Sequence, residues 1–215
     1  MSRSIKLWLF ALLMICFSAI TLFSITSAKP TVPDTRTLSQ GVSSKDRCTG
    51  NIHSSVKIVI YSDFQCPACA EAHEIFRRIE SDYSQKVHFV HRHFPVPQHK
   101  NSLLAAVAAE AAGEQGKFFE MREMIFHMQQ DWALSSTHGA YLFFLEAASK
   151  LGLDVNRFKV DLQRQELRER VLQDVRSGVS SKLQTVPSIF INGTFVQPSS
   201  EADLRKKIDA AIKGQ

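Results

Sequence analysis

The chain has 215 residues, of which 44% are apolar, and its formal net charge is +5. This length suits one domain with an elaboration, or at most two small domains, and the apolar share excludes wholesale disorder. Residues 29–215 hold 24 basic and 21 acidic residues, interspersed along the chain, so we expect no nucleic-acid partner.

Residues 1–28 have the pattern of a targeting segment. A short basic start and an apolar run to Phe23 precede the small residues Thr26-Ser27-Ala28, which a signal peptidase reads. We therefore expect either a cleaved signal peptide or an uncleaved membrane anchor that tethers the protein through residues 7–25. Both expectations place the rest of the chain in the periplasm or another extracytoplasmic compartment.

Residues 29–51 are rich in Pro, Gly, Ser and Thr and show little periodicity, which predicts a flexible linker. A buried strand is predicted over residues 56–61, because this stretch is rich in β-branched and aromatic residues. From Pro67 onward apolar residues recur at steps of three and four, which predicts a helix that begins at or directly after Cys66.

Cys66 and Cys69 form a Cys-X-X-Cys motif at this helix start. Unpaired N–H groups and the positive end of the helix dipole favour an anion there, so we expect a stabilised Cys66 thiolate. A structural disulfide and half of a zinc site are the alternatives, but the chain contains no second Cys-X-X-Cys. The pattern favours redox chemistry. If Cys66 and Cys69 pair with each other, Cys48 has no partner; it could be inert, form a dimer or act as a resolving thiol.

A second strand is predicted over residues 87–94, followed by a helical block over residues 99–182. Two charged stretches in this block, near 154–163 and 166–177, are interpreted as solvated helix faces. The chain then returns to strand on both sides of Asn192-Gly193, a strong hairpin signal, before a closing helix. This order of elements predicts a layered α/β fold.

Other polar residues are weaker candidates. Asp63 is either an acid that assists proton transfer from the second thiol or a turn-forming residue. His73 could join the two thiols around copper or zinc. Four further histidines could form a site around the second strand, although alternation on a half-exposed strand explains them as well: His88, His91, His93 and His99.

Several motifs resemble those of the DsbA-type thiol:disulfide oxidoreductases. The shared motifs are Asp63-Phe64-Gln65-Cys66-Pro67-Ala68-Cys69, Gln115-Gly116-Lys117-Phe118-Phe119, Leu151-Gly152-Leu153-Asp154 and Thr185-Val186-Pro187-Ser188. The resemblance identifies residues 52–215 as one DsbA-like domain. It implies an α/β, thioredoxin-like fold with an all-helical insertion, at about residues 99–182, between the βαβ and ββα halves.

The resemblance also implies the site. Cys66 would be the accessible sulfur that forms mixed disulfides, and Cys69 the buried sulfur that resolves them, beside a cis Pro187. Three neighbouring residues would contact the substrate: Pro67, Ala68 and Val186. The Val186 backbone would pair with a bound peptide. No metal and no cofactor is implied.

We therefore expect an exported enzyme that introduces disulfides into periplasmic or extracytoplasmic proteins. Its partners would be reduced or misoxidised substrate proteins and a quinone-linked membrane protein that reoxidises it. A reductase or isomerase of the same fold is the alternative, since Ala68 replaces the histidine that the oxidase DsbA has between its cysteines. A metallochaperone that uses Cys66, Cys69 and His73 is the alternative from another class.

Overall fold

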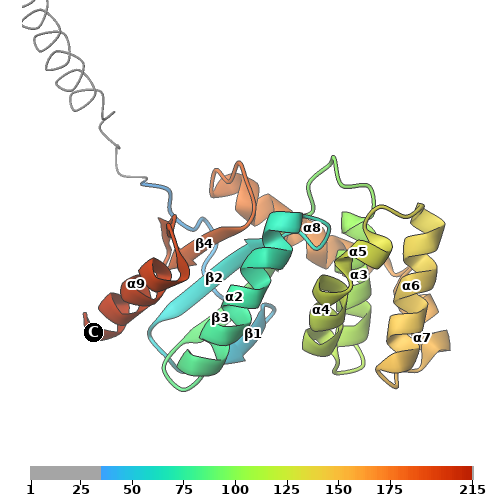
Figure 1. Cartoon of the computed structure of the whole chain (residues 1–215), viewed down its shortest axis with the longest axis horizontal. Coiled ribbons are helices and arrows are strands. Elements are labelled where there is room, and N and C mark those ends of the chain that lie inside the picture. Colours follow the sequence, from blue (N-terminus) through green and yellow to red (C-terminus); the bar gives the residue numbers. More distant parts are fainter. Residues whose placement is uncertain (1–34, 215) are drawn as a thin grey trace, which may run out of the picture. The chain divides into compact units, whose positions relative to one another are not determined.

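The structure, a computed structural model, describes residues 35–214; the predicted targeting segment 1–28, with the tether at 7–25, lies outside them. A five-stranded sheet with the order β1-β3-β2-β4-β5 forms the centre (Figure 1). Its strands are β1 (Arg47–Gly50), β2 (Lys57–Ser62), β3 (His88–His93), β4 (Ser188–Ile191) and β5 (Thr194–Val196). β2 and β3 are parallel, whereas the other neighbouring pairs are antiparallel.

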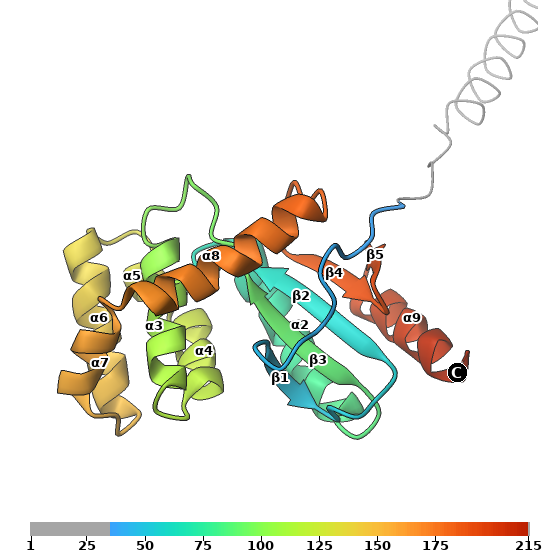
Figure 2. The same cartoon turned by 180° about the vertical axis from the view of Figure 1, so that it is seen from behind.

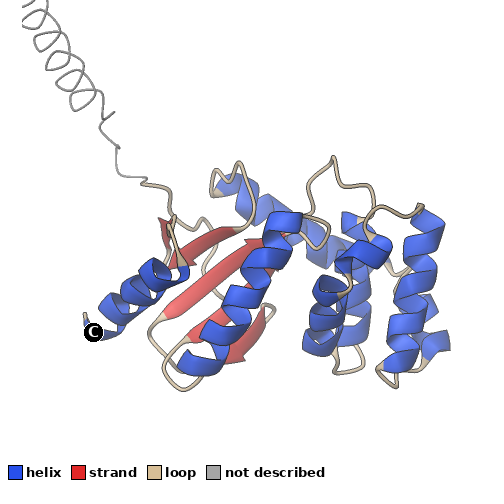
Figure 3. Ribbon diagram, in the orientation of Figure 1, coloured by secondary structure: helices blue, strands red, loops and turns tan. Residues whose placement is uncertain are grey.

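Helices cover both faces of the sheet and form the predicted insertion between β3 and β4 (Figure 3). They are α2 (Pro67–Tyr83), α3 (Ser102–Gly113), α4 (Phe118–His127), α5 (Gln129–Trp132), α6 (Thr137–Lys150), α7 (Val155–Asp161), α8 (Gln165–Ser180) and α9 (Glu201–Lys213). α2 and α9 lie on one face, while α8 and the segment before β1 cross the other (Figures 1 and 2). Within residues 35–214, no helix combines the length and hydropathy needed to cross a membrane.

The two-residue period of β2 explains why the sheet has helices or chain on both faces. Ile58 and Ile60 point to one face and pack with Phe76 of α2. Val59 and Tyr61 point to the other face and join a second apolar cluster beneath the segment before β1. Because both faces are apolar, neither can be left to solvent. The predicted α/β layered architecture is confirmed.

The predicted flexible linker over residues 29–51 is wrong for its described part. Residues 47–50 form β1, which pairs antiparallel with β3 at one edge of the sheet. At the opposite edge, Leu38 N donates to Gly193 O at 2.8 Å and Phe195 N donates to Arg36 O at 3.0 Å. The segment therefore protects the open edge of β5. Its partners lie far along the chain, so local periodicity does not reveal the pairing.

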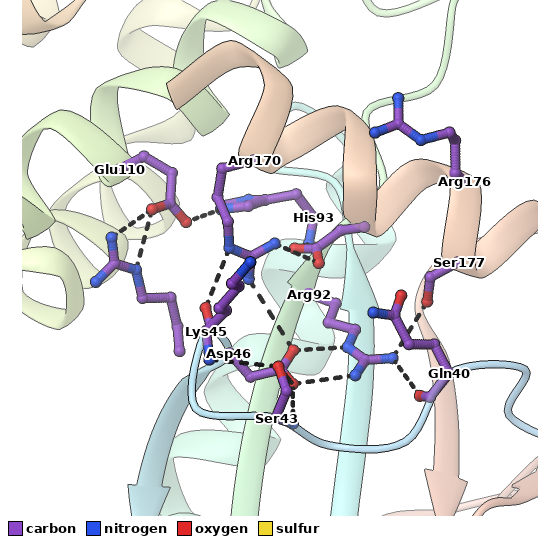
Figure 4. A network of polar contacts seen from close by, with 12 residues as sticks. Gln40, Ser43, Lys45, Asp46, Arg92, His93, Glu110, Arg170, Arg176 and Ser177 are labelled. Atoms are coloured by element: carbon purple, nitrogen blue, oxygen red, sulfur yellow. Dashed lines mark hydrogen bonds and ion pairs between the residues drawn. The ribbon is translucent and has the colours of Figure 1, made fainter. Parts of the chain in front are cut away.

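Buried ion pairs fasten this segment to the sheet (Figure 4). Arg92 of β3 is 2% exposed and donates to both carboxylate oxygens of Asp46, at 2.8 and 3.1 Å. The same guanidinium donates to the carbonyl oxygens of Gln40 and Gly41, at 2.9 Å each. Every donor of Arg92 that faces the segment thus has a partner, which offsets the cost of burying the charge.

The insertion joins the same region of polar contacts through α3 and α8. Arg170 donates to Asp174 at 2.6 Å, and Asp174 accepts a hydrogen bond from His93 N at 3.0 Å. Glu110 of α3 pairs with His93 at 2.9 Å and with Arg47 of β1. The predicted solvated face at residues 166–177 is therefore wrong at Arg170 and Asp174, because these two charges pack against β3 rather than facing water.

β1 ends at Gly50, where both the backbone conformation and close packing require glycine. Its φ is +74°, and a Cβ at this position would lie 2.3 Å from Val87 O. We expect Gly50→Ala to lower the free energy of unfolding by roughly 2–4 kcal/mol in denaturant titrations.

Gly193→Ala is the matched control. Gly193 has φ +81°, but its Cβ would meet no described atom within 4 Å, so only the backbone strain remains, about 1 kcal/mol. Equal losses in the two variants would contradict a tightly packed β1.

Candidate active site

Cys66 lies at the amino end of α2. Its extended backbone, with φ −77° and ψ 121°, leads directly into Pro67, the first helical residue, where a proline sacrifices no hydrogen bond. The Cys66 carbonyl accepts hydrogen bonds from the N–H groups of Cys69 and Ala70, each at 3.1 Å. The positive end of the helix dipole therefore lies beside the sulfur, as predicted.

The two thiols differ in exposure and in acidity. Cys66 is half-buried, whereas Cys69 is 1% exposed. The pKa of Cys66 is lowered to about 6, mainly by a hydrogen bond from the Cys69 thiol. Burial raises this pKa, the N–H groups of Cys69 and Ala68 lower it further, and the negative charge of Asp63 raises it. The same hydrogen bond, followed by burial, raises the pKa of Cys69 far above its usual value. Cys66 is thus the sulfur that ionises near neutral pH.

The segment that precedes β4 faces the cysteine pair. The Val186–Pro187 peptide bond is cis, as expected, and Cys66 Sγ lies 4.0 Å from Val186 O. Pro187 and Cys69 line one small internal cavity. Of the remaining predicted contact residues, Pro67 and Ala68 are exposed between the cysteines.

An apolar groove of about 310 Å³ opens beside Pro187. It lies between α2, the β4–β5 hairpin and the start of α9, and its walls include Ile75, Phe76, Ile189 and Phe195. A concave apolar surface beside a reactive sulfur suits an extended peptide that places apolar side chains in it.

Asp63 holds the start of the active-site loop, residues 63–66, against the segment that leads into α3. Its carboxylate accepts hydrogen bonds from Gln65 N at 2.8 Å, Val96 N at 2.9 Å, His99 Nδ1 at 2.8 Å and the Ser102 hydroxyl. The bond to Gln65 N makes it a turn-forming residue, one of the two predicted roles. The carboxylate contacts these four donors rather than a thiol.

Two glutamines attach the active-site loop to the insertion. Gln65 donates to Ala133 O at 2.6 Å and accepts from Asn101 N at 2.7 Å. Gln129, the first residue of α5, donates through Nε2 to Phe64 O at 2.7 Å and to Cys66 O at 3.0 Å. Sequence reasoning missed Asn101 and Gln129. An isolated polar residue in a helical pattern carries no local signal of a partner 36 or 63 residues away.

His73, the histidine proposed to bind a metal together with the two thiols, has other partners. His73 Nε2 lies 2.9 Å from Glu123 Oε2, and its ring stacks on Phe126 with centroids 4.5 Å apart. The expectation of a half-exposed second strand is wrong, because every residue of β3, including His91 and His93, is buried. Within residues 35–214, no three side chains among His, Cys, Asp and Glu come together as a metal ion requires.

Cys48 lies on β1, half-buried and opposite Val90 of β3. Burial, followed by the charge of Asp46, raises the pKa of its thiol to about 11. A thiol that stays protonated at neutral pH is a poor nucleophile, which favours the inert reading of this cysteine over a resolving role.

Comparison with known proteins places these observations in a family. Residues 43–210 match the family model described as Thioredoxin. Two curated relatives are the Na(+)/H(+) antiporter NhaA 3 of Salinispora tropica, 34% identical over 150 residues, and the Na(+)/H(+) antiporter NhaA of Herminiimonas arsenicoxydans, 32% identical over 157 residues. The matches cover 69% and 73% of this chain, but only 22% and 24% of the antiporters. The chain thus spans about a quarter of these relatives.

Solved structures share the fold over most of their length. Oxidised BdbD from Bacillus subtilis has a TM-score of 0.73 at 21% identity, covering 84% of this chain and 100% of its own. Alpha-DsbA1 from Wolbachia pipientis has a TM-score of 0.70 at 16% identity, covering 80% and 94%. The predicted thioredoxin-like fold with a helical insertion, in its DsbA-like form, is confirmed.

The acidity of Cys66 depends first on the Cys69 thiol, so removing that donor should raise the pKa of Cys66. We expect Cys69→Ala to raise the pKa of Cys66 from about 6 towards the ordinary thiol value of 9.0, as followed by the ultraviolet absorbance of the thiolate across pH. In Cys69→Ser the hydroxyl keeps a donor, so the rise should be smaller. The same pKa in all three proteins would show that Cys69 does not stabilise the thiolate.

Proposed function

This chain belongs to the thioredoxin family, and on that premise we propose that it is a thiol:disulfide oxidoreductase that introduces disulfides into extracytoplasmic proteins. The observation that carries the proposal is the asymmetry of the pair. One sulfur, Cys66, is half-buried and acidic, whereas its neighbour Cys69 is buried and weakly acidic. In such a pair, a substrate thiolate can attack the accessible sulfur of Cys66, while burial shields the sulfur of Cys69 from attack.

In the oxidising direction, the enzyme begins as the Cys66–Cys69 disulfide. A substrate thiolate attacks Cys66 Sγ, the Cys66–Cys69 bond breaks, and Cys69 leaves and takes up a proton. A second substrate thiolate then attacks the substrate sulfur of this mixed disulfide, and Cys66 leaves as its thiolate. The substrate gains a disulfide, and its two electrons remain on the two cysteines.

The acidity of Cys66 supports the oxidising direction. A stabilised Cys66 thiolate is a good leaving group in the second step and stabilises the reduced enzyme, which makes the disulfide a stronger oxidant. The alternative is a reductase or isomerase of the same fold, which would need a supply of electrons instead.

The surroundings of the site support a protein substrate. Val186 O next to the sulfur offers a backbone acceptor to an extended peptide, and the apolar groove beside Pro187 offers a place for its side chains. Reoxidation would need a partner that takes the two electrons, and we propose a quinone-linked membrane protein. The periplasmic or extracytoplasmic location rests on the predicted targeting segment at residues 1–28.

Two measurements test this function directly. Cys66→Ala should abolish disulfide transfer to a reduced test protein. Cys69→Ala should instead accumulate a mixed disulfide with a test protein that already contains a disulfide, because the Cys66 thiolate attacks that disulfide and no Cys69 thiol resolves the product. The redox potential of the pair in a glutathione buffer should lie near about −120 mV, the range of a strong oxidant. A value near roughly −270 mV, as in thioredoxin, would assign the chain to the reductases.

The groove makes a separate prediction about substrate size. Ile75→Glu places a charge in the groove wall without touching either sulfur, so we expect KM for a reduced protein substrate to rise by on the order of tenfold. The rate with a small thiol should stay unchanged. Ile52→Glu alters an isoleucine that is 60% exposed outside the groove and serves as the control. If Ile75→Glu leaves KM for the protein substrate unchanged, peptides do not bind in the groove.

A further inference from the structure

An ion pair beside the reactive sulfur has no part in the exchange steps described above. Asp63 precedes Cys66 by three residues, and its side chain is 0% exposed. His99 Nδ1 lies 2.8 Å from Asp63 Oδ2, and the His99 side chain is 28% exposed. Asp63 is therefore fixed in the interior, at the start of the active-site loop, and His99 is within reach of solvent.

Four hydrogen-bond donors point at the Asp63 carboxylate, as many as an ionised carboxylate accepts. Two of them are backbone N–H groups, of Gln65 and Val96, which can only donate. The third uncharged donor is the Ser102 hydroxyl. The carboxylate oxygens of Asp63 thus have donors on every side that the surrounding loop offers.

A fixed negative charge opposes a second one nearby. The Asp63 charge raises the pKa of the Cys66 thiol, against the lowering by the Cys69 thiol and the helix start. Among the ion pairs formed within residues 35–214, Asp63 takes part in one, with His99. Pro67 and Ala68, the residues between the cysteines, bring no charge of their own. His99 is thus placed to offset the carboxylate that opposes the thiolate.

We propose that His99, acting through Asp63, tunes the stability of the Cys66 thiolate and thereby the oxidising strength of the Cys66–Cys69 pair. An imidazolium at His99 balances the carboxylate, whereas a neutral imidazole leaves the carboxylate charge unbalanced. The link to oxidising strength rests on the proposed function, while the link to the thiolate does not. His99 would act on the sulfur only through the charge of Asp63, and it does not touch the reacting atoms.

Two substitutions at His99 separate charge from packing. His99→Gln keeps a hydrogen-bond donor and removes the charge, whereas His99→Lys keeps a permanent charge. In the reduced full-length protein at one mildly acidic pH, we expect the ratio of Cys66 thiolate to thiol to fall on the order of threefold to tenfold in His99→Gln. In His99→Lys the ratio should equal or exceed that of the wild type. Thiolate absorbance measures this ratio.

The equilibrium of the pair with glutathione should follow the same order. It should shift in favour of the disulfide in His99→Gln and return in His99→Lys. His53→Gln, at an exposed histidine away from the active-site loop, removes one histidine from the protein and should leave both quantities unchanged. A structural role alone would change the Gln and Lys variants in the same direction.

Equal effects in the Gln and Lys variants, or no effect in either, would overturn this inference. Disulfide transfer by the wild-type protein is measured in parallel with a reduced test protein. If the wild-type protein transfers disulfides but the thiolate ratios of the variants are unaltered, the role of His99 is refuted and the proposed function is retained. If the wild-type protein does not transfer disulfides but the thiolate ratios of the His99 variants are altered, the proposed function is refuted and the role of His99 is supported.

Discussion

The carbonyl oxygen of Cys66 receives hydrogen bonds from two directions, and the position of the reactive sulfur depends on both. From within α2, the N–H groups of Cys69 and Ala70 begin the helix there. From the insertion, Gln129 Nε2 donates to the same carbonyl at 3.0 Å and to Phe64 O at 2.7 Å. The helix start therefore supplies the electrostatic field that favours a thiolate, and α5 holds that start in a defined place. Without Gln129, the carbonyl of the buried Phe64 would lose the donor that it has in this structure.

Buried charges fasten the insertion and the amino-terminal segment to the sheet. Arg92 and Asp46 join the segment to β3, and Glu110 joins α3 to both β3 and β1. Such pairs contribute little net stability, but losing one partner leaves a buried charge without a counterion. They therefore favour one arrangement of three parts of the chain over its alternatives. The active-site loop benefits, because its contacts with Asn101 and Gln129 require the insertion to be in place.

The same construction explains how the site combines reactivity with protection. Cys69, in the first turn of α2, is buried, whereas Cys66 faces Val186 O and remains half-exposed. The groove beside Pro187 lies on the side of α2 that faces the β4–β5 hairpin and α9, away from the insertion. The insertion thus positions the sulfur and leaves the groove to a substrate. The chemistry depends on α2, and its geometry depends on elements that lie far from α2 in the chain.

Local patterns in the sequence determined much of this protein. The apolar run that forms β2, the Cys66-Pro67 helix start, the hairpin at Asn192-Gly193 and the closing helix each depend on neighbours within a few residues, and the structure has all four. The resemblance of the motifs added the helical insertion and the cis bond before Pro187. Interactions between residues that are close in sequence are enough for these features, because strand alternation, helix capping and turn conformations all depend on such neighbours.

Only the tertiary structure decided the rest. β1 is a strand because its backbone pairs with β3, although its four residues include an arginine and a glycine and show no strand pattern. The histidines of β3 are buried because chain segments cover both faces of the sheet. Gln129 and His99 belong to the site through partners 63 and 36 residues away. A polar side chain in a sequence shows which hydrogen bonds it can make, but folding alone decides which distant group satisfies it.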